Sequence, residues 1–147
     1  MSRFSDIQKA GATVLISSGA FGQVRTVANG LVIANQTGLQ YPAALWAIKE
    51  AIRGPHEGVS DTQLFDYTVN AFVVVIANSD GSELGDAREF GWHLVDAVLH
   101  AFANFVPTLA AINISAAPCE PGNIEPVEVD AGQSAYYIPL TFQLFWS

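Results

Sequence analysis

The sequence has little cysteine and little charge, and each shortage excludes a class of protein. Cys119 is the only cysteine among 147 residues, so an intrachain disulfide and a cysteine-based metal cage are both excluded. Charged residues make up 14% of the chain, whereas hydrophobic residues make up 50%. With so few charges, much of the surface has to be neutral or apolar, which favours a protein whose surface is partly covered by a partner.

Basic residues are also scarce. The formal net charge is −8, which argues against tight binding to a nucleic-acid backbone. The few bases gather in residues 1–53, and Arg88 is the only Lys or Arg after Arg53. Two explanations remain open: complementary ends that guide subunits into a ring, or exposed loops that are acidic simply for solubility.

No apolar run is long enough to span a membrane. The richest segment, 95–114, is interrupted by His100, Asn104 and Pro107. The N-terminal residues also lack the basic-then-apolar pattern of a signal peptide. The sequence therefore predicts a soluble intracellular protein with no membrane partner.

The pattern of apolar residues predicts a single α+β domain over residues 1–147. We expect a mixed, mostly antiparallel sheet of about four to five strands, with two main helices packed on one face. The helices are predicted at 4–18 and 86–106, and the strands at 23–27, 41–51, 64–77, 108–117 and 134–146. Segment 28–36 is ambiguous, 53–62 and 78–82 are a loop and a turn, and 118–132 is an extended acidic arm or hairpin.

Two strand predictions carry specific expectations. The half of strand 64–77 from Phe72 onward is continuously apolar, so it should be buried on both faces, either at the centre of the sheet or under another subunit. In the last strand, alternate residues from Tyr136 to Trp146 are apolar and belong on the core. Pro139 cannot donate a backbone hydrogen bond, so it predicts an edge strand or a bulge there.

The helix predicted at 86–106 is apolar over most of its circumference. Its apolar arc is about twice the roughly 100° of an ordinary surface helix. One side should therefore pack on the sheet, and the other on the first helix or on a neighbouring subunit.

The polar stripe of this helix is the best candidate for chemistry. Glu89, His93, Asp96 and His100 fall within an arc of about 60° at 100° per residue. Such a stripe suits zinc or another divalent ion in a small metal-binding enzyme. The alternative is a solvated face, which the missing HExxH pattern and missing further ligands favour. Because there is also no GxSxG elbow and no phosphate loop, we expect no enzyme, no cofactor and no catalytic residue.

Large aromatic residues are the candidates for binding another chain, since such side chains anchor many interfaces. The interface candidates are Trp46, Trp92, Phe102, Phe105, Tyr136, Tyr137 and Trp146.

Four segments together resemble the tail terminator proteins of long-tailed and contractile-tailed phages and of related phage-like bacteriocins. They are the Pro-led strand 41–46 (YPAALW), the strand 70–77 (NAFVVVIA), the helix 88–102 (REFGWHLVDAVLHAF) and the closing strand 135–145 (AYYIPLTFQLF). The resemblance covers nearly the whole chain as a pattern of elements, without a signature motif.

The resemblance implies a structural virion protein that forms a ring, with a hexamer expected. The ring would cap the tail tube, stop its polymerisation and join it to the head or neck. The implied partners are further copies of the chain, the tail tube protein and a neck or connector protein, with DNA passing through the lumen unbound. A head–tail connector of the same virion region is the alternative. Either role implies a place at the head-proximal end of the tail, after assembly in the host cytoplasm.

Overall fold

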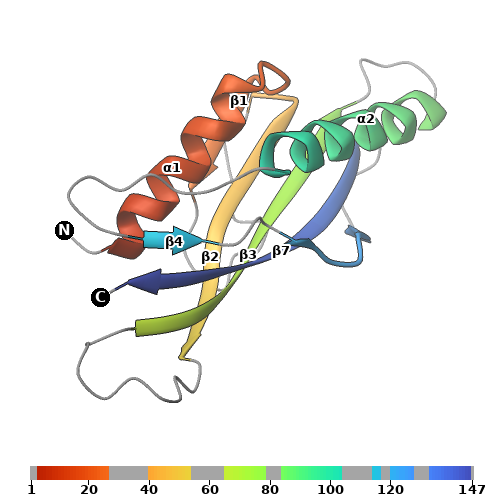
Figure 1. The fold of residues 1–147 in the computed structure, drawn as a ribbon. Helices are drawn as coiled ribbons and strands as arrows, with labels where there is room; N and C mark the ends of the chain where they lie inside the picture. Colours follow the sequence, from red (N-terminus) through yellow and green to blue (C-terminus); the bar gives the residue numbers. More distant parts are fainter. Residues whose placement is uncertain are drawn as a thin grey trace.

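The computed structural model describes residues 3–26, 40–53, 65–78, 84–103, 114–116, 120–127 and 133–146. Two helices and seven strands lie in these ranges (Figure 1). In chain order they are α1 (Arg3–Ser17), β1 (Gln23–Thr26), β2 (Ala43–Arg53), β3 (Phe65–Asn78), α2 (Leu84–Phe102), β4 (Ile114–Ala116), β5 (Glu120–Pro121), β6 (Glu125–Val127) and β7 (Gln133–Trp146).

The strands form one mixed sheet in the order β1-β2-β3-β7-β4, with β5 and β6 also paired to β7. β1 runs parallel to the start of β2, and the remaining described pairs are antiparallel. β3 lies between β2 and β7, which explains why its second half is apolar on both faces. The register between β2 and β3 shifts between Ile48 and Glu50, so Lys49 is an extra residue in β2.

The edge beside β7 is an interrupted strand. β4, β5 and β6 pair successively with different stretches of β7. Between β5 and β6, the Gly122 N–H donates to the Pro139 carbonyl oxygen at 2.8 Å. Because the N–H and C=O of one strand residue point to the same side, the donor that Pro139 lacks falls at this interruption. The last strand is therefore not the sheet edge that Pro139 predicted, and the missing donor is accommodated by the break in its neighbour.

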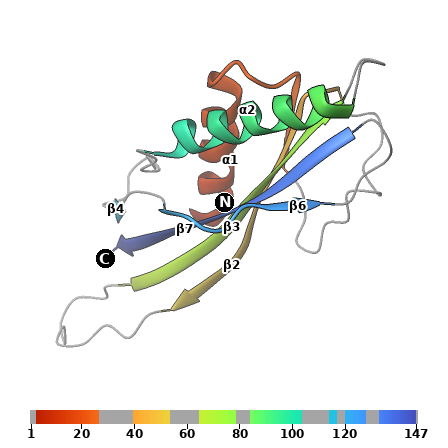
Figure 2. The ribbon, with the colours of Figure 1, turned by 90° about the vertical axis from the view of Figure 1, so that its right-hand side faces the viewer.

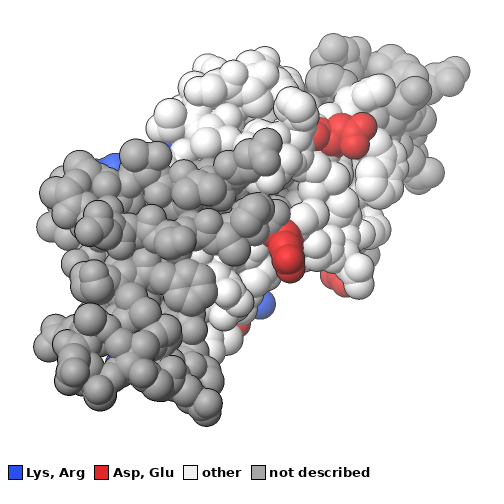
Figure 3. Space-filling model, viewed as in Figure 1, with Lys and Arg blue, Asp and Glu red and all other residues white. Residues whose placement is uncertain are grey.

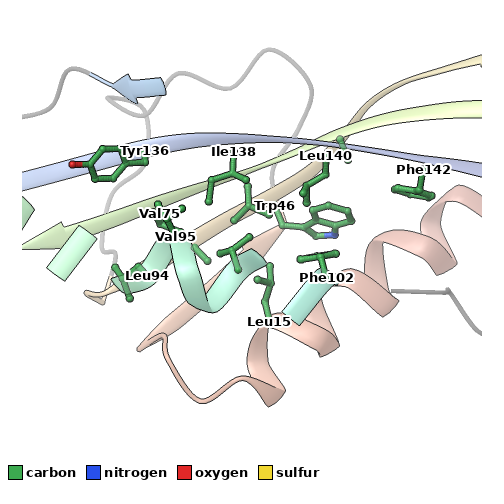
Figure 4. Packing of buried hydrophobic residues seen from close by; sticks show 14 of the residues in the cluster. Leu15, Trp46, Val75, Leu94, Val95, Phe102, Tyr136, Ile138, Leu140 and Phe142 are labelled. Atoms are coloured by element: carbon green, nitrogen blue, oxygen red, sulfur yellow. The ribbon is translucent and has the colours of Figure 1, made fainter. Parts of the chain in front are cut away.

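Both helices cover the same face of the sheet (Figures 1 and 2). One buried cluster joins Ile7 and Leu15 of α1 to four α2 residues and to alternate residues of β2, β3 and β7. The α2 members are Leu94, Val95, Val98 and Phe102, and the β7 members are Tyr136, Ile138, Leu140 and Phe142 (Figure 4). Alternation along β7 thus places its apolar set on the helices, as the sequence predicted.

A second buried cluster lies on the opposite face of the sheet, on which neither of the two described helices packs and which we call the helix-free face. Its members are Leu45, Ala47, Phe72, Val74, Ile76 and Ala135. Farther along the same face, the row through Asn70 is polar. On this face the buried apolar cluster is therefore followed along the strands by one polar row, of Glu50, Asn70 and Thr141.

The predicted α+β class, the mostly antiparallel sheet and the two helices on one face are confirmed. The sheet has more strands than expected because its edge is broken into short pieces. The last described helical residue of α2 is Phe102, and the strand predicted at 108–117 is described at Ile114–Ala116. The predictions for 28–36, 54–62 and 79–82 lie outside the described residues.

Candidate assembly surfaces

Trp46 and Phe102, two of the interface candidates, are buried in the core of the described fold. Trp46 is fully buried, and its ring centroid lies 5.3 Å from that of Phe102 (Figure 4). The indole N–H donates to the Gln8 carbonyl oxygen of α1 at 2.8 Å. A Cβ on Gly11 would lie 2.4 Å from two indole carbons, so only a residue without a side chain lets α1 approach this closely. The two aromatics therefore join α1, α2 and β2.

Trp92 forms an exposed aromatic site with Tyr136. The side chain of Trp92 is 51% exposed, and its ring centroid lies 4.5 Å from that of buried Tyr136. A Cβ on Gly91 would lie 2.6 Å from Tyr136 Cε2, so the absence of a side chain at Gly91 brings α2 down onto β7. Trp92 is thus held on a fixed platform while much of its apolar surface faces solvent, which is the character of an interface anchor.

The other interface candidates are placed as follows. Tyr137 is half-buried on the helix-free face, where its ring stacks on that of Phe72 at 5.3 Å. Phe105 and the side chain of Trp146 lie outside the described part of the chain.

The polar stripe of α2 lies on the solvent side of the helix. His93, Asp96 and His100 are exposed, opposite the buried residues of the same helix, and the Glu89 side chain is not among those described. Among the described residues, no group of three or more His, Cys, Asp or Glu side chains is placed to hold a metal ion. No described helix has the length and apolarity needed to cross a membrane.

A hydrogen-bonded row of polar side chains crosses the helix-free face, and the sequence did not predict it. Asn70 of β3 donates through Nδ2 to Glu50 Oε1 at 3.0 Å and accepts from Thr141 Oγ1 at 3.1 Å. These residues occupy matching positions on β2, β3 and β7. The three residues become neighbours through the register of the paired strands. That register can be deduced only when it is known which strands pair, so the row could not be predicted from the sequence.

Sequence reasoning also missed three exposed apolar side chains. Tyr41 is 38% exposed beside the start of β2, and Ile52 is 51% exposed near its end. Ile16 on α1 is 64% exposed. On the face shown in Figure 3, few of the described residues are charged.

No protein-family model matches the chain, and no curated protein matches it. Among solved structures, it is similar to a chain from the virion of a native gene transfer agent particle. The TM-score is 0.53 and the sequence identity 12%, and the match covers 99% of this chain and 98% of that chain. At this identity the likeness establishes a shared fold, and the fold is shared from one end of both chains to the other.

Proposed function

We propose that this protein is a structural component of the virion of a phage or phage-like particle, and that it acts as the tail terminator. The observation that carries the proposal is the fold shared over the full length with a chain of a gene transfer agent virion. The resemblance of four sequence segments to tail terminators supports the head-proximal end of the tail as the place of this protein in such a particle.

The proposed terminator is a ring of identical subunits, with a hexamer expected. It caps the tail tube, stops tube polymerisation and contacts a neck or connector protein on its other side. Its place is the head-proximal end of the tail, and it assembles in the host cytoplasm. Solvent-exposed Trp92, Tyr41 and Ile52 support an assembled role, because buried apolar surface is a main source of association energy.

A net charge of −8 is compatible with a ring whose lumen DNA passes through. Like charges repel, so an acidic lumen lets the double helix pass without specific binding. The proposal therefore includes DNA as cargo that passes through, with no nucleic-acid site on the protein. It includes no enzymatic step.

A head–tail connector is the second candidate, because the matched structure is named for the whole virion particle. The two roles differ in what they touch: a terminator binds the last ring of tube subunits, whereas a connector binds the head side.

Deletion of the gene for this chain, followed by electron microscopy of the resulting particles, separates these roles. If the protein is a terminator, its loss leaves tubes of uncontrolled length and filled heads without tails. If the protein is a connector, its loss leaves tails of normal length that fail to join heads. Infectious or transfer-competent particles with normal tails would contradict both roles. Complementation with the intact gene is the control.

A further inference from the structure

The two lateral edges of the sheet carry opposite charges. Sheet order places β1 and β2 at one edge, and β5 and β6 beyond β7 at the other. We call the first the basic edge, with Arg25, Lys49 and Arg53, and the second the acidic edge, with exposed Glu120 and Glu125. Among the described residues, part of the charge asymmetry along the sequence is thus an asymmetry between two sides of one sheet.

One charged residue of each edge, Arg25 and Glu125, lies at the same level along the strands. Arg25 pairs in register with Leu45, Leu45 with Val74, Val74 with Tyr137, and Tyr137 with Glu125. Residues that are directly paired across a sheet point to the same face. Arg25 and Glu125 therefore end one row, on the helix-free face. A second copy placed beside this row would bring its Glu125 next to Arg25 of the first. The row of Glu120 runs through Thr141 and Asn70 and ends at Glu50, so Arg25 and Glu125 are the pair of opposite charges that the registers align.

Glu50 is the only acidic residue in β2, and its carboxylate is engaged within the sheet. It accepts the hydrogen bond from Asn70, which lies toward the centre of the sheet. The bond holds the carboxylate toward Asn70, and the carboxylate keeps its charge, so the described part of this edge carries three bases, Arg25, Lys49 and Arg53, against one acid. The positive charge of exposed Lys49, next to it in the chain, remains available to a partner.

Apolar side chains accompany the charges on both sides. Tyr41 and Ile52 are exposed at the two ends of β2, on the basic edge. Trp92 lies over Tyr136, which pairs in register with Pro126 of the acidic edge. An exposed apolar side chain thus lies in or near each edge, on β2 at the basic edge and on α2 above β7 near the acidic edge, where it can supply the apolar part of an interface.

Backbone pairing between copies is opposed at both edges. The extra residue Lys49 interrupts the ladder of β2, and Pro121 and Pro126 lack backbone donors on β5 and β6. Bulges, lysines and prolines are the devices that stop strands from adding to a sheet edge. Association through these edges would therefore use side chains.

We propose that the basic edge of one copy binds the acidic edge of the next. This inference rests on the proposed function, and it names the surfaces by which the ring would close. Because the two surfaces differ, the contact is head-to-tail, and such contacts generate a closed ring when the rotation between copies permits it. Complementary charge sets the order and register of the copies, and the apolar anchors supply buried area.

Charge reversal of each edge tests the contact in the full-length protein. One variant carries Lys49→Glu and Arg53→Glu, and the other carries Glu120→Lys and Glu125→Lys. We expect each alone to weaken self-association, measured by light scattering, by about tenfold or more. Mixing the two variants in equal amounts should restore assembly, because every contact in an alternating ring is again between opposite charges. Combining all four changes in one chain should do the same.

A matched control reverses a charge outside the two edges. Lys9→Glu on α1 alters an exposed residue that belongs to neither edge's strands and should leave self-association unchanged. Circular dichroism checks that every variant is folded. In the unaltered protein, raising salt from about 0.1 M to about 1 M shortens the screening length from about 10 Å to about 3 Å and should weaken association.

Three results would overturn the contact: an unaltered protein that is monomeric at every concentration, folded reversal variants that associate normally, or a mixture that stays dissociated. These failures are distinguishable from failure of the proposed function. If the edge contact is wrong but the function is right, gene deletion still alters tails or their joining. If the function is wrong, particles assemble normally after gene deletion, whether or not the charge-reversal variants self-associate.

Discussion

The indole N–H of Trp46 donates to the carbonyl oxygen of Gln8 across 38 residues of chain, at 2.8 Å. This bond anchors β2 to the middle of α1, at the place where Gly11 lets the helix rest on the indole ring. The position of one helix on the sheet is therefore set by a glycine and a tryptophan that are distant in sequence.

Gly11→Ala should destabilise the protein. The added methyl group would lie 2.4 Å from indole carbons in the core, so α1 has to move. Such overpacking costs about 1–3 kcal/mol, partly offset by the roughly 1 kcal/mol by which alanine favours a helix. Urea unfolding measures the net loss. Ile16→Ala on the exposed side of the same helix is the control and should change stability by less than about 0.5 kcal/mol. Equal or greater stability of Gly11→Ala would contradict this packing.

Gly91→Ala should push α2 away from β7. Its methyl group would lie 2.6 Å from Tyr136 Cε2, and we expect a loss of about 1–3 kcal/mol. Tyr136→Val removes the obstructing ring, so the double variant should lose less than the sum of the two single changes. A double-mutant cycle measured by urea unfolding gives this coupling, and strict additivity would show that the two residues do not meet.

The sequence predicted most elements but not their close contacts. Strand 41–51 was predicted from alternation although its residues favour helix, and β2 confirms that tertiary context outweighed propensity. The aromatic character of Trp46 was compatible with a place in the core or at an interface, and its contact with Gly11 of α1 could not be predicted from either segment alone. The pattern of one segment states which residues are apolar, whereas burial depends on which other segment covers them.

The polar row is another feature that only strand pairing reveals. Asn70→Ala removes the donor to Glu50 and the acceptor for Thr141, both on a partly exposed face. We expect a loss of about 1 kcal/mol of stability. Thr141→Val alone should cost less, and its effect should vanish in the Asn70→Ala background. If Thr141→Val costs the same in both backgrounds, the row is not coupled.

The edges of the sheet show the same limit of prediction. The clustering of bases before Arg53 was visible in the sequence, yet the alignment of Arg25 with Glu125 needed four strand registers. Lys49 as an extra residue in β2 was not predicted, because a bulge leaves the composition of a strand unchanged. The role of Pro139 was likewise misjudged, since the break in its neighbour lies in a different segment.

The histidine stripe is expected to serve as a solvated helix face. Changing His93 and His100 together to Gln should leave folding and self-association intact, because both side chains are exposed. Elemental analysis of the purified, unaltered protein should find no stoichiometric metal. One bound zinc per chain, lost in the double variant, would instead support the metal-binding alternative.

Assembly into a ring is the central claim, and imaging the purified protein by negative-stain electron microscopy tests it most directly. The account predicts closed rings with one fixed number of subunits, about six by resemblance to tail terminators. Uniform monomers, or open filaments that never close, would contradict it.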